Sequence, residues 1–229
     1  MEVDYSIPGW GNEHKMNSLA SIVEFYVRSN DDPIAVLEIG TLVGRSTVNI
    51  NLNLRAKDRL TTVDMNQQGV SNNLLRSQNT TDKSIFGDLI KWNKLLDMSL
   101  LDARQVIIKE FFTDNIHFTF CGDGSDNFFK MNSNKFDVIY VDGDHYMPTV
   151  GNDLKNSYDN LSPGGLMIID DFGSEWPDVQ GAVLAVLNEN LQASFFYSRQ
   201  LGVAIIEKTR YDNHNTGKII AKLTSEIKL

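Results

Sequence analysis

Three aspartates stand directly after two apolar runs that have the character of buried strands. Asp142 follows the run Phe136 to Val141, and the pair Asp170 and Asp171 follows the run Leu166 to Ile169. Because neighbouring parallel strands end at the same edge of a sheet, we expect the three carboxylates to converge. Like charges at short range are unfavourable unless protons or a cation lie between them, and hard oxygen ligands suit Mg²⁺. The pattern therefore predicts a metal-assisted site.

A second candidate site is the turn after the run Ala35 to Ile39. Gly40 and Gly44 carry no side chain there, so backbone N–H groups and a helix N-terminus can face a ligand. The spacing Gly-x-x-x-Gly lacks the middle glycine with which a dinucleotide fingerprint approaches its pyrophosphate. The turn therefore disfavours a dinucleotide, while a tight turn without any ligand stays an alternative.

Two more turns follow the next two apolar runs. Asp64 comes directly after Leu60 to Val63, where an acidic side chain can accept hydrogen bonds from both ribose hydroxyls. The turn Gly122 to Ser125 follows the run Ile116 to Phe120 and is placed to close over an adenine edge. The plain alternatives are a helix cap for Asp64 and an ordinary turn residue for Asp123. Three turns at the carboxyl ends of three strands favour a ligand site.

The elements that position these residues indicate an α/β fold with helices on both faces of a mostly parallel sheet. Five apolar runs predict buried strands: Ala35 to Ile39, Leu60 to Val63, Ile116 to Phe120, Phe136 to Val141 and Leu166 to Ile169. Apolar residues at three and four spacing predict helices: His14 to Arg28, Thr47 to Leu54, Ile85 to Glu110, Thr149 to Tyr158 and Val179 to Asn190.

One predicted helix and the last two predicted strands depart from this simple pattern. In Thr47 to Leu54 the apolar residues also alternate with polar ones, which is the period of a strand. We nevertheless predict a helix, because this segment lies between two adjacent parallel strands, which require a crossover connection. The runs Ser194 to Arg199 and Gly202 to Glu207 are separated only by Gln200 and Leu201. That spacing predicts a hairpin, so the last strand is expected to run antiparallel.

Composition narrows the class of protein. The chain has 229 residues, 41% hydrophobic and 22% charged, which is ordinary for one globular domain. With 21 basic and 30 acidic residues the net charge is -9, and no basic block could neutralise a run of phosphates, so nucleic acid is not an expected partner. One cysteine, no secretory signal pattern and no membrane-length apolar run predict a cytoplasmic protein without a membrane partner.

The sequence resembles the class I S-adenosylmethionine-dependent methyltransferases, in the branch of catechol-type and macrolide-sugar O-methyltransferases. The resemblance covers Ile34 to Lys208. Its carriers are the segments Glu38 to Ser46, Val141 to His145 and Leu161 to Gly165, together with Asp64 and the pair Asp170-Asp171. The family implies a Rossmann-like, seven-stranded, mostly parallel sheet with an antiparallel last strand, in which the predicted hairpin supplies the last two strands.

The resemblance also implies roles for individual residues. S-adenosylmethionine would be bound by the residues Glu38, Gly40, Thr41, Gly44, Ser46, Asp64, Asp123, Gly124, Ser125 and Asp142. The metal ligands of the family match Asp142, Asp170 and Asp171, with Mg²⁺ as the expected ion. The catalytic base matches His145, because an imidazole with a pKa near neutrality can take a proton from an acidified hydroxyl.

Alternatives to these roles stay open. His145 can be a loop histidine that caps the next helix, Asp170 and Asp171 can cap the segment after them, and metal-independent relatives exist. The leading hypothesis is a Mg²⁺-assisted O-methyltransferase that acts on a small hydroxylated molecule, a sugar or a phenol. The competing hypotheses are a nucleotide- or dinucleotide-binding oxidoreductase and a non-catalytic S-adenosylmethionine-binding protein.

The expected domain organisation is simple. Residues 1–33 form an N-terminal helical lid or substrate segment, residues 34–208 the methyltransferase domain and residues 209–229 a polar tail. Homo-oligomers are common, and the N-terminal helix is a candidate interface.

Overall fold

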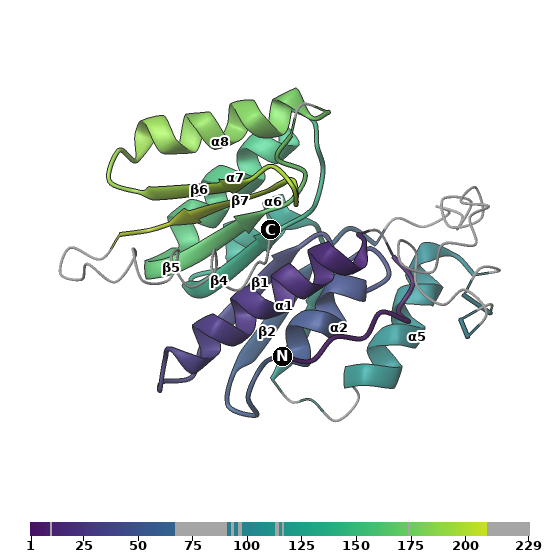
Figure 1. Cartoon of the computed structure of the whole chain (residues 1–229). Helices are drawn as coiled ribbons and strands as arrows, with labels where there is room; N and C mark the ends of the chain where they lie inside the picture. The colour runs from purple at the N-terminus through teal and green to yellow at the C-terminus, as the bar shows by residue number, and fades with distance from the viewer. Residues whose placement is uncertain are drawn as a thin grey trace. The chain divides into compact units, whose positions relative to one another are not determined.

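The structure, a computed structural model, describes residues 1–9, 11–66, 91–92, 94–95, 98–112, 115, 117–173 and 175–209 (Figure 1). Its seven strands follow the order β3-β2-β1-β4-β5-β7-β6, a Rossmann-like mixed sheet with the number of strands that the family resemblance implies. The chain divides into two compact units. Unit 1 comprises Met1–Pro33 and Thr41–Gly124, and unit 2 comprises Ile34–Gly40 and Ser125–Leu229. The two units are described separately.

Five strands belong to unit 2. They are β1 (Ala35–Ile39), β4 (Phe136–Val141), β5 (Leu161–Ile169), β6 (Ser194–Ser198) and β7 (Val203–Glu207). Strands β1, β4 and β5 pair in parallel, and β7 pairs antiparallel with both β5 and β6. The predicted antiparallel last strand is therefore confirmed. All of β1 is buried, as a near-continuous aliphatic strand in the interior of a parallel sheet should be.

Strand β5 differs from its prediction. It begins at Leu161 rather than Leu166, so the Pro-Gly-Gly turn lies inside the strand. Leu161 pairs with Phe136, and the register with β4 shifts before Val138 pairs with Leu166. The hairpin connection is also longer than predicted, since β6 ends at Ser198 and β7 begins at Val203.

Three helices are described in unit 2. They are α6 (Ser125–Met131), α7 (Thr149–Asn160) and α8 (Pro177–Glu189), of which α7 connects β4 to β5 and α8 connects β5 to β6. Helix α7 packs against α8, β4 and β5, and it covers them with residues such as Val150 and Leu154. Helix α8 begins at Pro177, as its fixed φ and missing N–H favour. Helix α6 was not predicted, because its seven residues carry no long apolar stripe.

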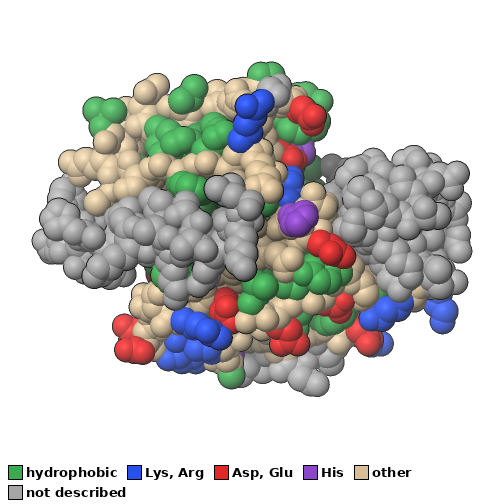
Figure 2. Space-filling view, viewed as in Figure 1, with side chains coloured by type: hydrophobic (Ala, Val, Ile, Leu, Met, Phe, Trp, Pro, Cys, Tyr) green, Lys and Arg blue, Asp and Glu red, His purple; other side chains and the backbone are tan. Residues whose placement is uncertain are grey.

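The hairpin of unit 2 presents aromatic side chains at the sheet edge. Phe195 and Tyr197 alternate with less exposed neighbours along β6, and both have more than a third of their surface exposed. The ring of Phe172 contacts both of them edge-on, at centroid distances of 5.8 Å and 4.8 Å. Figure 2 shows hydrophobic side chains exposed over the α8 and β6–β7 region. The edge strand β6 therefore exposes aromatic side chains on one of its faces.

Unit 1 contains the other described elements. They are α1 (Glu13–Arg28), α2 (Arg45–Asn51), β2 (Arg59–Val63), α5 (Leu100–Phe112) and β3 (Phe118–Cys121), with β2 and β3 parallel. Strand β3 begins two residues later than predicted. The predicted helix Ile85 to Glu110 is too long at its N-terminal side, because the described residues 91–92, 94–95 and 98–99 are not α-helical and α5 begins at Leu100. Residues 85–90 lie outside the described residues, as do most of the predicted loop Met65 to Lys83 and the C-terminal tail. None of the helices in the described ranges has the length and apolar character needed to cross a membrane.

Helix α2 explains the unusual pattern of its sequence. It is a helix, as predicted, but spans Arg45–Asn51 instead of Thr47 to Leu54. The side chain of Asn49 accepts from the N–H of Asp4 at 2.7 Å and donates to its carbonyl at 3.2 Å. Four residues later, just past the end of α2, Asn53 makes the same pair of bonds to Glu2. The two asparagines therefore bind the extended N-terminal segment, which is why polar residues alternate here.

Candidate active site

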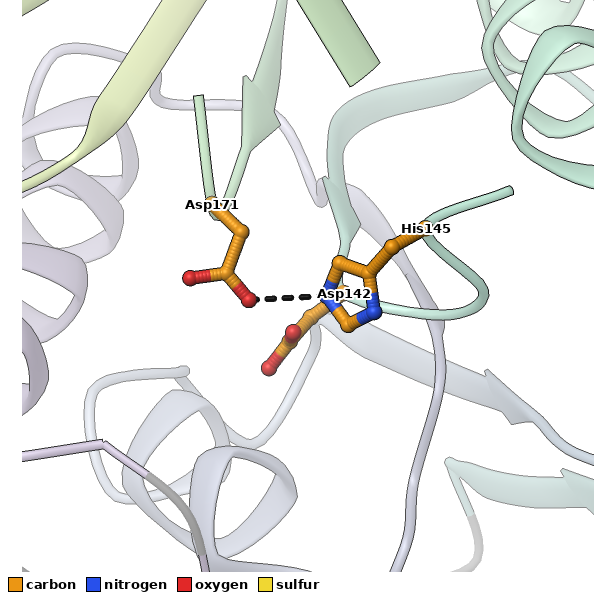
Figure 3. Close-up of side chains that lie close together, drawn as sticks. All are labelled: Asp142, His145 and Asp171. Carbon is orange, nitrogen blue, oxygen red and sulfur yellow. Dashed lines mark hydrogen bonds and ion pairs between the residues drawn. The ribbon is translucent and has the colours of Figure 1, made fainter. Parts of the chain in front are cut away.

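The side chains of Asp142, His145 and Asp171 converge in unit 2. Asp142 follows β4, Asp171 lies two residues after the end of β5, and His145 stands in the loop after β4 (Figure 3). One potential ligand atom from each residue lies within 4.8 Å of the others. His145 Nε2 is 2.8 Å from Asp171 Oδ2. The structure thus brings together the predicted base and two of the three predicted metal ligands.

Asp170, the third predicted ligand, lies outside this group of three. Its carboxylate accepts from the Tyr140 hydroxyl at 2.9 Å and from the N–H of Asp171 at 2.7 Å. Asp170 is buried, whereas Asp171 adopts a left-handed φ of 54°. Aspartate tolerates this backbone region better than most residues. The two adjacent carboxylates therefore have different surroundings.

Tyr140 connects the two acidic positions. Its hydroxyl lies 3.2 Å from Asp142 Oδ2 in addition to its bond to Asp170. Burial raises the pKa of Tyr140 well above its ordinary value, and the charges of Asp142, Asp170 and Glu38 add to this effect. The phenol therefore stays protonated and acts as a donor to carboxylates. Sequence reasoning missed Tyr140, although strand alternation places it on the same face as Asp142, two residues away.

The donor set of the three converging residues fits a divalent cation. Two carboxylates supply hard oxygen ligands and two negative charges, which repel each other at this range unless a cation or a proton lies between them. The imidazole face of His145 stacks on Trp176 at a centroid distance of 4.3 Å, and Tyr146 meets Trp176 edge-on at 5.7 Å. The aromatic contacts and the Asp171 bond together fix the orientation of the His145 ring.

Gly40 allows close approach of two strand ends in unit 2. A Cβ at this position would lie 1.9 Å from the carbonyl oxygen of Asp142, and the φ of Gly40 is +95°. The N–H of Asp142 bonds to the carbonyl of Ile39 at 2.9 Å. Glu38, one residue earlier and fully buried, is in register with Tyr140. Only glycine therefore fits the point where β1 meets the residue that follows β4.

The rest of the glycine turn lies in unit 1, where it contacts Asp64. Asp64 Oδ2 accepts from the N–H groups of Thr41 at 3.0 Å and Leu42 at 2.7 Å. Gly44 has a φ of +110° and directly precedes α2, in whose first turn Ser46 is buried. In the structure Asp64 therefore binds the backbone of the glycine turn, while its predicted hydrogen bonds to ribose hydroxyls stay a prediction.

The turn after β3 lies beside the same aspartate. Asp123 forms an isolated antiparallel bridge with Met65, and the N–H of Gly124 lies 3.4 Å from the carbonyl of Asp64. Gly124 has a φ of +78°, which favours glycine. Ser125 follows as the first residue of α6, in unit 2.

Asp153 is a buried carboxylate that sequence reasoning did not identify. It lies on α7, is 2% exposed, and its Oδ2 would lie 3.3 Å from a Cβ at Gly143, in the loop between Asp142 and His145. The side chain of Ser125 hydrogen-bonds to it. Within the described ranges, Asp153 Oδ1 and the Ser157 hydroxyl one helical turn later have no hydrogen-bond partner. Asp153 therefore links the start of α6 to the loop that carries His145.

Replacing Asp153 by asparagine is expected to stabilise the protein above pH 6. Burial raises the pKa of Asp153 from 3.8 to about 6, the Ser125 bond opposes this, and Asp126 and Asp144 add to it. The folded state therefore holds a proton that the unfolded state releases, so stability falls as the pH rises through this window. We expect the variant to gain about 1–3 kcal/mol in unfolding free energy at pH 7.5 and little at pH 4.

Urea unfolding at both pH values measures this difference. Asp159→Asn is the matched control, because Asp159 lies on the same helix with an exposed side chain. Equal stabilities of the Asp153→Asn variant and the unsubstituted protein at pH 7.5 would contradict the expectation.

Comparisons with known proteins agree with this geometry. Residues 37–172, more than half of the chain, match a family model described as a methyltransferase domain. The matched range includes the glycine turn, Asp64, Asp142, His145 and Asp171. A search of the curated proteins gives no match.

Several solved structures share the fold. The O-methyltransferase TomG from Streptomyces achromogenes, involved in tomaymycin synthesis and solved with S-adenosylmethionine, has a TM-score of 0.56 and 14% identity over 87% of this chain and 82% of its own. A Bacillus cereus O-methyltransferase in complex with S-adenosylhomocysteine has a TM-score of 0.53 and 16% identity, with coverages of 87% and 82%. The S-adenosylhomocysteine-bound methyltransferase PaMTH1 of Podospora anserina has a TM-score of 0.57 and 14% identity, with coverages of 89% and 91%.

Proposed function

Because the chain belongs to the methyltransferase domain family and is an S-adenosylmethionine-dependent methyltransferase, we propose that it methylates a hydroxyl oxygen of a small molecule. The observation that carries this proposal is the convergence of Asp142, His145 and Asp171. A histidine beside two carboxylates can accept a proton from a hydroxyl, which an O-methyl transfer requires. Two relatives of the same fold, TomG and the Bacillus cereus protein, are O-methyltransferases.

The glycine turn, the residue after β2 and the turn after β3 are each proposed to contact the methyl donor. Glu38, Gly40, Thr41, Gly44 and Ser46 would bind S-adenosylmethionine through the turn and the start of α2. Asp64 would face the ribose, and the segment Asp123, Gly124 and Ser125 the adenine. Asp142, the residue whose carbonyl oxygen lies beside Gly40, would complete the set. The support is the positive φ of Gly40 and Gly44, which shapes the turn before α2, and the hydrogen bonds of Asp64 to the turn.

The proposed acceptor site holds a divalent cation, with Mg²⁺ as the expected ion. Asp142 and Asp171 would be its principal ligands, and Asp170 would support them through Tyr140 or contribute its own carboxylate. When bound, Mg²⁺ would supply the positive charge that makes a coordinated hydroxyl more acidic. The residues present thus offer the oxygen ligands that this ion prefers, and Tyr140 holds two of the three carboxylates in place.

His145 would accept the proton of the acceptor hydroxyl. Its Nε2 faces Asp171, so an imidazole that donates from Nε2 to this carboxylate carries its lone pair on Nδ1. Stacking on Trp176 limits rotation of the ring. The sulfonium of the donor is already a good leaving group, so the remaining contribution of the protein is to orient the reacting atoms.

Incubation with labelled S-adenosylmethionine and a panel of sugars and phenols tests the proposal. We expect label transfer to at least one hydroxylated acceptor, and we expect removal of divalent cations with EDTA to reduce the rate until Mg²⁺ is restored. Transfer that is unaffected by EDTA would contradict the cation site. Binding of S-adenosylhomocysteine without transfer to any acceptor would instead favour a non-catalytic binding protein, and a preference for NAD(H) would favour an oxidoreductase.

A further inference from the structure

Leu42 in the glycine turn has an unusual backbone conformation that its neighbours hold from both sides. Its φ is 48°, in the left-handed region that costs energy for a residue with a side chain. Its N–H donates to Asp64 Oδ2 at 2.7 Å, and its carbonyl accepts from Arg104 Nε at 2.6 Å. Both polar groups of the strained residue are therefore fixed by two side chains from elsewhere in unit 1.

Those two side chains also bind each other. Arg104 Nη2 lies 2.8 Å from Asp64 Oδ2, the same oxygen that accepts from Thr41 and Leu42. Arg104 comes from α5, is only 4% exposed, and its guanidinium lies over the ring of Phe120 at 5.1 Å. Three residues thus form a closed arrangement in which the guanidinium binds the carboxylate and the turn carbonyl at once.

We propose that Arg104 is a positioning residue for the methyl donor: through Asp64 and the carbonyl of Leu42, it holds the glycine turn in its binding conformation. The proposal rests on the donor site proposed above. A planar guanidinium can bind two acceptors in fixed directions, which a lysine ammonium or a neutral amide cannot reproduce. Without Arg104, Leu42 can relax toward an ordinary φ, and part of the donor's binding energy must then restore the turn.

The test compares S-adenosylhomocysteine affinity by isothermal titration in four proteins. We expect Arg104→Gln to raise Kd by about 10- to 100-fold, because it removes charge-assisted bonds to two acceptors. We expect Arg104→Lys, which keeps the charge but not the planar fork, to raise Kd less. Arg55→Gln is the matched control. Arg55 makes an equivalent network in unit 1, to Asp58 and to the carbonyls of Asn30 and Asp32, without contact to the glycine turn.

A second measurement separates positioning from general stability. In a Leu42→Gly background the left-handed conformation costs little, so we expect Arg104→Gln to raise Kd by a smaller factor there than in the original sequence. We also expect the Arg104→Gln enzyme to show a raised KM for S-adenosylmethionine, with kcat at saturation changed by less than about threefold. General destabilisation would produce neither the coupling to Leu42 nor this split.

The outcomes distinguish the two proposals. Failure of the unsubstituted protein to bind S-adenosylhomocysteine would overturn the donor site and this inference with it. Binding by the unsubstituted protein with an unchanged Kd in Arg104→Gln would overturn only the role of Arg104. If the Arg104→Gln protein does not fold, Arg104→Lys is measured in its place. An unchanged Kd for Arg104→Lys, both in the original sequence and in the Leu42→Gly background, would then overturn the inference.

Discussion

An Asp142→Ala enzyme is expected to fold and to lose methyl transfer by about 100- to 10,000-fold, the loss that corresponds to several kcal/mol of charge stabilisation. Asp142 supplies one of the two carboxylates that converge with His145, and its removal halves the negative charge available to a cation. Its backbone bond to Ile39 survives in alanine, and Tyr140 keeps Asp170 as an acceptor. The rate of label transfer at saturating donor measures the effect.

Asp144→Asn is the matched control for this variant. Asp144 lies in the same loop, carries the same charge, and is exposed, with its Oδ1 bonded to the N–H of Tyr146 at 3.2 Å. A small change in rate for Asp144→Asn, with a large one for Asp142→Ala, locates the effect in the converging carboxylate rather than in the net charge of the loop. Retention of a tenth or more of the rate by Asp142→Ala would exclude a catalytic cation at Asp142.

Strand ends were predictable from the sequence because the strands are strongly apolar. Phe136 to Val141 is the observed β4, so the position of Asp142 at the edge of the sheet follows from the length of one hydrophobic run. Choosing between Asp170 and Asp171 was not possible in this way. Their side chains diverge because Asp171 has a left-handed φ and Asp170 meets the hydroxyl of Tyr140, and both facts depend on tertiary contacts.

The glycine turn shows the same division. Gly40 and Gly44 could be recognised because they carry no side chain at the turn after a strand, and Asp64 because it directly follows a strand. Arg104 carries no comparable signal, since it stands 40 residues after Asp64 on a helix of ordinary composition. Asp153 is similar, because a single aspartate among polar helix residues gives no indication that folding will bury it. Sequence periodicity therefore does not reveal the side chains that support a site from helices or strands elsewhere in the chain.

A His145→Ala enzyme is expected to lose methyl transfer by about 100- to 10,000-fold, as removal of a positioned general base does. The imidazole lies beside the two carboxylates, histidine is the side chain that most often acts as a general base, and Asp171 and Trp176 fix the orientation of the ring. His117→Gln serves as control, since His117 belongs to unit 1, directly before β3, and is not one of the three converging residues. Initial rates at saturating Mg²⁺ measure the loss.

Mg²⁺ affinity distinguishes a base role of His145 from a ligand role, because one of its ring nitrogens also belongs to the set of potential ligand atoms. If His145 is the base, isothermal titration should give nearly the same Mg²⁺ affinity for His145→Ala and the original enzyme, because Mg²⁺ prefers oxygen ligands and both carboxylates remain. Asp171→Ala should weaken Mg²⁺ binding in the same assay, since it removes one of those oxygens. Equal weakening of Mg²⁺ binding in both variants would make His145 a ligand, and the proton acceptor would then have to be another group. A lower rate of the His145→Ala enzyme with an unchanged Mg²⁺ affinity is the result expected if His145 is the base and not a metal ligand.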